Sequence, residues 1–102
     1  MIVVGNTTLD HDSRVLSTDT GRQVRLTRTE TTVLGEILRL GGLTARGDAL
    51  MNLIWAGREN GPADPILRVR VCNLRKCLRA IGSTVGVRSE YGRGYRAEVE
   101  NV

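Results

Sequence analysis

The feature that most constrains the fold of this chain is the stretch DPILRVRVCNLRKCLRAIG, residues 64–82. At about 100° per residue in a helix, its apolar side chains form one narrow stripe, made of Leu67, Val71, Leu74 and Leu78. Asp64 is placed to cap this helix, and Pro65 stands at the first helical position, where its missing N–H costs no hydrogen bond. Such a helix needs other elements around it, because the stripe has to be buried.

The side of this helix opposite the stripe is basic. It carries Arg68, Val69, Cys72, Asn73, Lys76 and Arg79, with Arg70 and Arg75 on the flanks. Residues 64–96 hold eight basic groups and two acids, a net charge of +6, whereas residues 1–63 hold seven of each sign. Charge gathered in one part of a chain indicates a polyanionic partner, most often nucleic acid. The alternative is that the arginines form an ordinary solvated face.

The two cysteines raise the alternative of a metal or redox site. Cys72 and Cys77 are five residues apart, so on a helix they point in different directions. His11 is the only histidine and is distant in sequence, so a zinc site would lack ligands. We therefore expect reduced thiols, no metal and no cofactor. No paired carboxylates and no Ser-His or Cys-His arrangement stand at catalytic spacing, and we expect no enzymatic activity.

Length and hydropathy indicate how many domains the protein has and whether it spans a membrane. A chain of 102 residues suits one domain with one modest core, which we expect to span residues 1–102. No stretch approaches the roughly 18 apolar residues of a membrane span, and MIVVGNTTLD turns polar too early for a signal peptide. These patterns predict a cytoplasmic protein with no membrane partner.

The first 26 residues read as short strands. Runs with alternating polarity, MIVV, TTLD, SRVLS and RQVRL, are separated by turn residues at Gly5-Asn6, His11-Asp12 and Thr20-Gly21. They predict a small antiparallel sheet over residues 1–26, with His11 in a turn.

From Thr27 the apolar period becomes helical. Thr27 and Glu30 have the spacing of a capping box, and Gly41-Gly42 supplies a stop. A second helix is predicted in TARGDALMNLIWAG, residues 44–57, with an apolar face of Leu50, Met51, Ile54 and Trp55. Its start is ambiguous, because Thr44 is the better cap whereas Gly47 weakens a first turn.

The segment VGVRSEYGRGYRAEV, residues 85–99, reads as two strands around a Gly-Arg-Gly turn. A phosphate-binding loop is the alternative for Gly92 and Gly94, and it is weak because no helix follows. The predicted fold is therefore α+β, a winged helix-turn-helix. It has an N-terminal antiparallel sheet (1–26), a three-helix core (27–82) that contains the basic helix (65–80), and a C-terminal β-hairpin wing (83–99).

Four segments carry a resemblance to a known family. LTRTETTVL, Trp55 shortly before a loop, LRVRVCNLRKCL and EYGRGYR are similar in content and spacing to the winged-helix effector domain of OmpR/PhoB-type response regulators. The similarity runs from about Leu9 to Arg96, and VCNLRKCL with YGRGY most resembles the CtrA-type DNA-binding domains. The resemblance implies a sequence-specific double-stranded DNA-binding transcription regulator associated with the nucleoid. No phosphoacceptor receiver domain is recognised, so we expect action without phosphorylation input, as an excised domain or as a complete small protein.

In this family the third helix enters a major groove and the wing reaches an adjacent minor groove. The contact positions that the resemblance carries over are Arg70, Cys72, Asn73 and Arg75 on the helix and Ser89, Tyr91 and Arg93 on the wing. Asparagine suits a two-point contact with adenine. Tyr91 stands where many members have arginine, so the minor-groove contact is expected to shift to Arg93. The other cations of the helix, Arg68, Lys76 and Arg79, are expected to bind phosphates.

A protein-interaction module is the alternative function. In the family, the loop between the second and third helices touches the transcription machinery, and here it contains Arg58, Glu59 and Asn60. RNA polymerase or a sigma factor would be the partner, or the domain would antagonise a CtrA-type full-length regulator. The resemblance also implies a head-to-tail homodimer on DNA.

Overall fold

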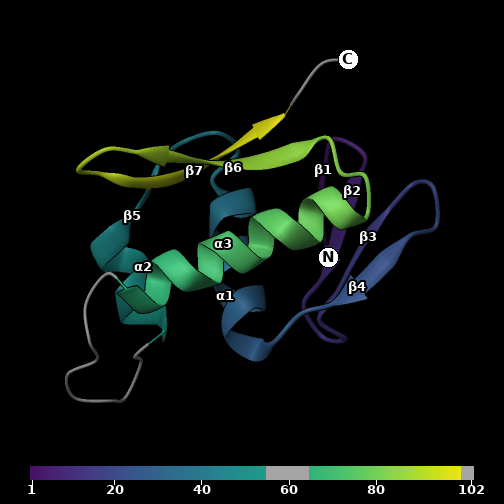
Figure 1. The fold of residues 1–102 in the computed structure, drawn as a ribbon, viewed down its shortest axis with the longest axis horizontal. Helices are drawn as coiled ribbons and strands as arrows, with labels where there is room; N and C mark the ends of the chain where they lie inside the picture. Colours follow the sequence, from purple (N-terminus) through teal and green to yellow (C-terminus); the bar gives the residue numbers. More distant parts are fainter. Residues whose placement is uncertain (55–64, 100–102) are drawn as a thin grey trace.

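The structure is a computed structural model that describes residues 1–54 and 65–99. Its elements are β1 (Ile2–Val4), β2 (Thr7–Asp10), β3 (Val15–Thr18), β4 (Gln23–Arg25), α1 (Arg28–Arg39), β5 (Ala45–Arg46), α2 (Gly47–Ile54), α3 (Pro65–Ala80), β6 (Val85–Glu90) and β7 (Gly94–Val99). In Figure 1, α3 crosses the front of the molecule, the β6–β7 hairpin lies alongside it, and β1 to β4 form the opposite end from α2 and β5. The predicted α+β winged helix-turn-helix class is confirmed.

The N-terminal sheet has the strand order β1-β2-β3-β4, with every neighbouring pair antiparallel. Alternation along the strands turns Leu9 and Leu16 into the core, where they pair across β2 and β3 and are fully buried. His11 lies in the β2–β3 turn, as predicted, and its ring sits against Gly35 of α1. A Cβ at Gly35 would stand 2.5 Å from that ring, so the glycine makes room for the turn to pack on α1.

Helix α1 begins with the capping box that the sequence predicts. The Glu30 backbone N–H donates to the Thr27 hydroxyl at 3.2 Å, and the Thr27 N–H donates to the Glu30 carboxylate at 3.0 Å. The pair satisfies two N–H groups that a helix start otherwise leaves without partners. After α1, Gly41 and Gly42 adopt φ of 60° and 101°, which a β-carbon disfavours.

The second helix starts at Gly47, later than a cap at Thr44 would predict. Ala45–Arg46 form strand β5, which pairs antiparallel with β7, and α2 begins at Gly47. Thr44 is therefore not its cap, because the residues after Thr44 bond to a strand instead of opening a helical turn. Leu50 is fully buried and Met51 and Ile54 are partly buried against the core, as expected, whereas Trp55 lies outside the described residues.

The stripe of α3 is buried as predicted. The exposed fractions of its four side chains are 3% for Leu67, 0% for Val71, 0% for Leu74 and 2% for Leu78. Burial of one such side chain contributes about 2 kcal/mol, so the stripe strongly favours this rotation of the helix. It packs against α1 and β6. The predicted cap, Asp64, lies outside the described residues.

Hydrogen bonds join the N-terminal sheet to the turn that links α3 and β6. The Asn6 side chain donates to the Gly82 carbonyl at 3.1 Å and accepts from the Thr84 N–H at 2.8 Å. The Thr18 hydroxyl donates to the Ile81 carbonyl at 3.0 Å. The C-terminal end of α3 is thus fixed to the sheet. Within the described ranges, no helix is long and apolar enough to cross a bilayer.

The capping box gives a test of the local account. We expect Thr27→Ala to lower the free energy of unfolding by about 1 kcal/mol, because the Glu30 N–H loses the hydroxyl to which it donates. Thr32→Ala is the matched control, since its hydroxyl only donates to the Arg28 carbonyl within the helix. Urea denaturation followed by circular dichroism measures both variants, and equal midpoints for Thr27→Ala and wild type would contradict the assignment.

Candidate nucleic-acid interface

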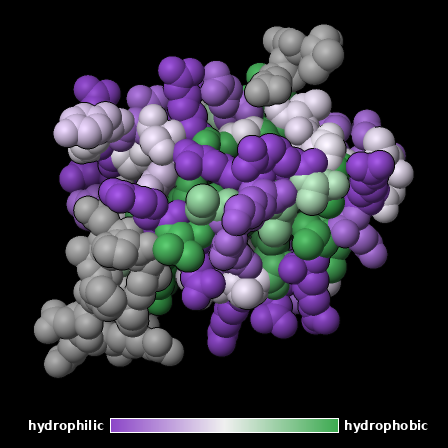
Figure 2. Space-filling view, viewed as in Figure 1, coloured by the Kyte–Doolittle hydropathy of each residue, from purple (hydrophilic) through white to green (hydrophobic). Residues whose placement is uncertain are grey.

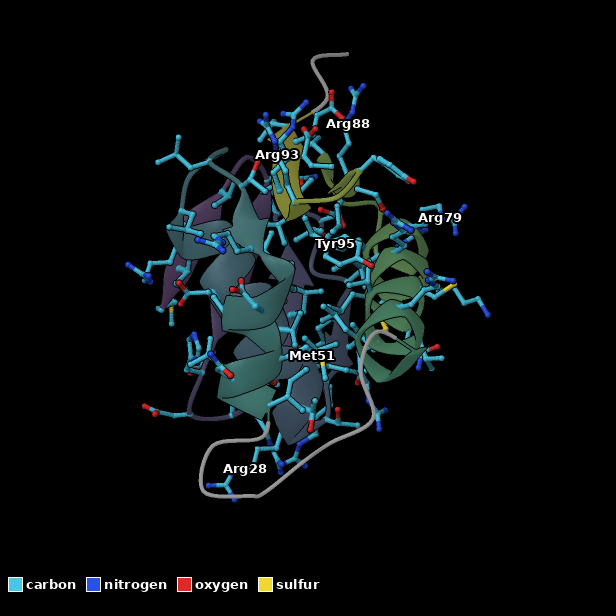
Figure 3. All side chains as sticks on the ribbon, turned by 90° about the vertical axis from the view of Figure 1, so that its left-hand side faces the viewer. Arg28, Met51, Arg79, Arg88, Arg93 and Tyr95 are labelled. Atoms are coloured by element: carbon cyan, nitrogen blue, oxygen red, sulfur yellow. The ribbon has the colours of Figure 1, made fainter. Side chains whose placement is uncertain are left out.

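The outer face of α3 carries most of the cations of the helix. Arg68, Val69, Cys72, Lys76 and Arg79 are exposed, and Arg70, Asn73 and Arg75 are partly buried. Figure 2 views the molecule from this side, where hydrophilic side chains dominate and hydrophobic ones show between them. In Figure 3, Arg79 points away from the body of the protein on the α3 side. The structure therefore places Arg68, Cys72, Lys76 and Arg79 on the accessible side of α3, and Arg70, Asn73 and Arg75 are less accessible.

Asn73 lies near the middle of this face, and no described residue makes a hydrogen bond with its side-chain amide. An amide free of internal partners can donate to one group and accept from another. Val69 is 56% exposed, although it is apolar. From the sequence, Val69 is predicted on the outer side of the helix, but it is not among the predicted DNA contacts. An apolar residue on a basic helix face could have indicated such a contact.

The wing is the β6–β7 hairpin. Its turn runs from Tyr91 to Arg93 and is closed by a hydrogen bond from the Arg93 N–H to the Glu90 carbonyl at 2.9 Å. The Tyr91 side chain is fully exposed, and Arg93 is exposed at the same turn. Tyr95 points inward, between the wing and the helices, and packs against the core (Figure 3). The turn thus presents one aromatic ring and one cation.

The two glycines of the wing have structural roles. Gly92 adopts a φ of 73° in the turn. Gly94 lies so close to β5 that a Cβ there would stand 2.0 Å from the Ala45 carbonyl oxygen. The Gly47 N–H, at the start of α2, also donates to the Arg93 carbonyl at 3.0 Å. Turn geometry and strand pairing account for both glycines, so the phosphate-loop alternative loses its support.

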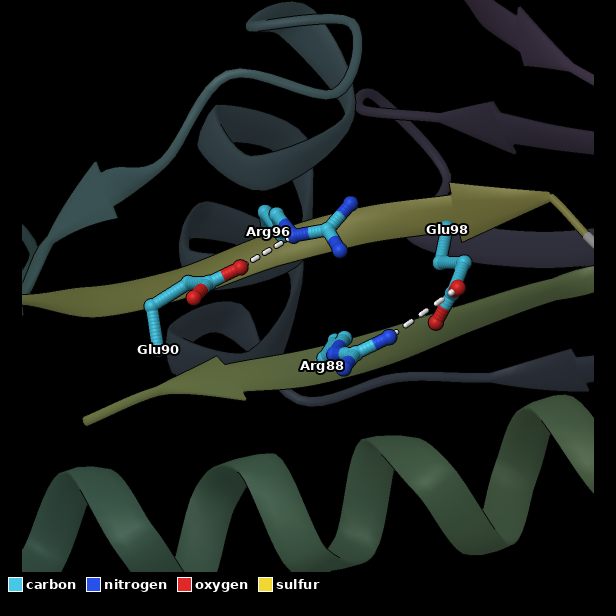
Figure 4. Close-up of polar contacts among 4 residues, drawn as sticks. All are labelled: Arg88, Glu90, Arg96 and Glu98. Atoms are coloured by element: carbon cyan, nitrogen blue, oxygen red, sulfur yellow. Dashed lines mark hydrogen bonds and ion pairs between the residues drawn. The ribbon is translucent and has the colours of Figure 1, made fainter.

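The outer face of the wing is balanced in charge. Arg88 and Arg96 stand directly opposite each other in the β6–β7 register, where like charges repel. Each has an acidic partner: Arg88 pairs with Glu98 at 3.4 Å, and Arg96 pairs with Glu90 (Figure 4). These four residues contribute no net charge, so the positive surface of the C-terminal third belongs to α3 and the wing turn.

Two predicted contact residues bind each other. The Arg75 Nε donates to the Val87 carbonyl at 2.9 Å, and its Nη2 donates to the Ser89 hydroxyl at 2.8 Å. Ser89 lies on the inner face of the hairpin, opposite Tyr95 in the register. This contact ties α3 to the wing, a relation that the sequence did not indicate.

No disulfide joins Cys72 and Cys77. Cys72 is exposed and Cys77 is partly buried, and both are free thiols. Burial raises the pKa of the Cys77 thiol, and the nearby Glu30 carboxylate raises it further. A raised pKa keeps this thiol protonated and unreactive at neutral pH. No three side chains of metal-binding type come together in residues 1–54 and 65–99.

The candidate protein-interaction loop is not part of this surface. Arg58, Glu59 and Asn60 lie outside the described residues, so their role stays a prediction.

Comparison with known proteins identifies relatives of this fold. The sequence model of the family described as "Transcriptional regulatory protein, C terminal" matches residues 21–97. No curated protein matches the sequence. Among solved structures, the DNA-binding domain of CadC from E. coli is 22% identical, with a TM-score of 0.81 over 97% of this chain and 92% of that one. Similarity to the CtrA type stays a prediction.

Two further neighbours were solved as complexes. The AdeR DNA-binding domain, in complex with an intercistronic region, is 22% identical, with a TM-score of 0.77 over 96% of this chain and 99% of that one. The RstA DNA-binding domain of Klebsiella pneumoniae, in complex with the RstA box, is 24% identical, with a TM-score of 0.73 over 93% of each chain. At these identities the likeness shows the fold alone.

The close approach at Gly94 generates a second test. We expect Gly94→Ala to lower the free energy of unfolding by about 2–4 kcal/mol, because the new Cβ overlaps the β5 backbone and the β5–β7 pair must open. Gly92→Ala is the control: its φ is also positive, but no atom lies within 4 Å of the added carbon, so it should cost about 1 kcal/mol. Urea unfolding measures both, and a Gly94→Ala variant as stable as Gly92→Ala would refute the close approach.

Proposed function

This chain belongs to the family of C-terminal domains of transcriptional regulatory proteins, and from that premise we propose that it binds double-stranded DNA sequence-specifically and regulates transcription. The observation that carries the proposal is the basic, accessible face of α3 beside a wing whose turn carries Arg93. The complexes of AdeR with an intercistronic region and of RstA with the RstA box support it by analogy of fold. We further propose that the domain binds DNA without phosphorylation input.

In this proposal α3 enters the major groove with its outer face. B-DNA has a major groove about 12 Å wide, which admits one helix. Asn73, near the middle of the face, meets a base edge, where asparagine suits adenine. Val69 is suited to contact a thymine methyl group. Arg79 lies two turns nearer the C-terminal end, where the helix leaves the groove, and binds phosphate.

The wing turn reaches the adjacent minor groove. Tyr91 and Arg93 are the exposed residues that it presents, and Arg93 supplies the positive charge that the narrow groove attracts. Because Arg88 and Arg96 are paired with acids on the outer face, the hairpin directs its free charge to the turn. The two ends of the surface then read neighbouring grooves.

The number of cations that can bind phosphate determines how strongly DNA affinity depends on salt. Apart from Arg75, which donates to β6, five cations on α3 and the wing turn make no ion pair with another described residue: Arg68, Arg70, Lys76, Arg79 and Arg93. If each neutralises one phosphate, the logarithm of affinity falls against the logarithm of salt with a slope of about −4 to −5.

Fluorescence anisotropy with a labelled random-sequence duplex across a salt series measures this slope. We expect Arg88→Gln to leave it unchanged, because Arg88 faces Glu98 on the outer side of the wing. A flat response of the wild-type protein would reject DNA binding. A slope that falls by about one unit in Arg88→Gln would show that the outer face of the wing contacts DNA.

Loss of a base contact and loss of a phosphate contact should change DNA affinity in different ways. We expect Asn73→Ala to cost about 1–3 kcal/mol on a duplex selected by the wild-type protein and little on a scrambled one. Arg79→Ala should weaken both duplexes alike and reduce the salt slope by about one unit. Titration of each variant with both duplexes at two salt concentrations checks this, and equal weakening by Asn73→Ala would reject the assignment of α3 as the reading helix.

A further inference from the structure

Arg75 of α3 is hydrogen-bonded to the wing, through Val87 and Ser89 of β6. We propose that Arg75 is a positioning residue that holds the wing in a fixed relation to α3, and that it does not itself bind phosphate. This inference rests on the proposed function, because it concerns how the two DNA-reading elements act together. It departs from the sequence-based expectation, which placed Arg75 and Ser89 among the DNA contacts.

The geometry of the guanidinium supports this role. Arg75 is partly buried and donates from two different nitrogens, to the Val87 carbonyl at 2.9 Å and to the Ser89 hydroxyl at 2.8 Å. Arginine is suited to such a forked contact because its donors lie in one rigid plane. To bind a phosphate through Nε and Nη2, Arg75 would have to give up both of these bonds. The exposed Arg79, one turn later, makes no hydrogen bond to the wing strands.

The place of β6 in its sheet explains why such a contact is needed. The strand order is β5-β7-β6, so within the described residues β6 is an edge strand that pairs only with β7. A two-stranded hairpin has little stability of its own, and an edge strand is the part most easily displaced. Arg75 holds this edge from α3, the same helix that carries Asn73. Beside the apolar packing of α3 on β6, this side chain adds two hydrogen bonds between the reading helix and the wing.

The other strand of the hairpin is held independently. Ala45 and Arg46 of β5 pair with β7, and the Gly47 N–H donates to the Arg93 carbonyl at 3.0 Å. The wing is thus held on both strands, by α2 and β5 on one side and by Arg75 on the other. Arg93 then stands at a fixed distance from α3 before DNA arrives. Such preorganisation favours simultaneous contact with two grooves, because less freedom is lost on binding.

A double-mutant cycle tests the coupling. Arg75→Gln and Arg93→Ala are made singly and together, and each affinity is measured by fluorescence anisotropy on a duplex selected by the wild-type protein from a random pool. We expect the loss caused by Arg93→Ala to be about three- to tenfold smaller when Arg75 is already replaced, because a loosened wing uses Arg93 less well. The salt slope of Arg75→Gln should fall by less than the one unit that loss of a phosphate contact would cause, because Arg93 keeps part of its contact.

Two further variants separate positioning from charge. Arg75→Lys keeps the positive charge but cannot make the forked contact, so it should show the same loss of coupling as Arg75→Gln. Arg79→Gln removes one charge from the same helix and is the matched control. It should lower the salt slope by about one unit and act independently of Arg93→Ala. Thermal unfolding of every variant establishes that it is folded at the temperature of the titration.

Hydrogen exchange in the free protein tests the contact without DNA. Amides of residues 85–93 should exchange faster in Arg75→Gln and Ser89→Ala than in wild type, with those of α1 unchanged. A protein that binds no duplex would refute the proposed function, yet this exchange would still show the tie between α3 and the wing. Unchanged exchange overturns the positioning role. So does a fall of about one unit in the salt slope of Arg75→Gln with additive effects in the cycle, since that identifies a phosphate contact.

Discussion

The arrangement of the whole molecule depends on the burial of one side of α3. Its apolar stripe packs against α1 and β6, and this contact allows the helix only one rotation about its axis. A turn of the helix in either direction would expose leucine and bury arginine, at a cost of several kcal/mol. Because the stripe is fixed, the outer face that carries Asn73 is fixed too. The bond from Thr18 to Ile81 then holds the end of the helix on the N-terminal sheet.

The basic residues of the C-terminal third differ in their surroundings: some pair with acids, one is bonded to a strand, and the others are at least partly exposed to solvent. By sequence, residues 64–96 carry a net charge of +6. In the structure, Arg88 and Arg96 balance Glu98 and Glu90 on the outer face of the wing, and Arg75 is bonded to β6. Among the described residues of this third, the cations without an ion pair or a side-chain hydrogen bond lie on α3 and at the wing turn. Net charge along a sequence thus overstates the number of groups available to a polyanion, and the salt dependence reports the smaller number.

Much of the fold follows from sequence because its signals are local. The capping box of Thr27 and Glu30 spans four residues, and the stripe of α3 repeats within one helix. The hairpin also has its turn signal inside the segment itself. What the sequence did not indicate is long-range. Strand β5 is only two residues long and exists because β7 passes beside it.

The candidate site shows the same division. The periodicity of α3 predicted which of its residues face outward, and the positions of Asn73 and Arg79 agree with it. The partners of Arg75 lie 12 and 14 residues away, on a strand whose path around the helix no local pattern specifies. Only the packed structure distinguishes an arginine that faces solvent from one that joins two elements.

We propose that the outer face of α3 and the wing turn form one surface for DNA. The most direct measurement is a titration of the isotopically labelled protein with a duplex selected by it, followed by amide chemical shifts. We expect the largest changes on α3 between residues 68 and 79 and at residues 91–93, with small changes in β1 to β4. Large changes confined to the N-terminal sheet, with α3 and the wing turn unaffected, would contradict it.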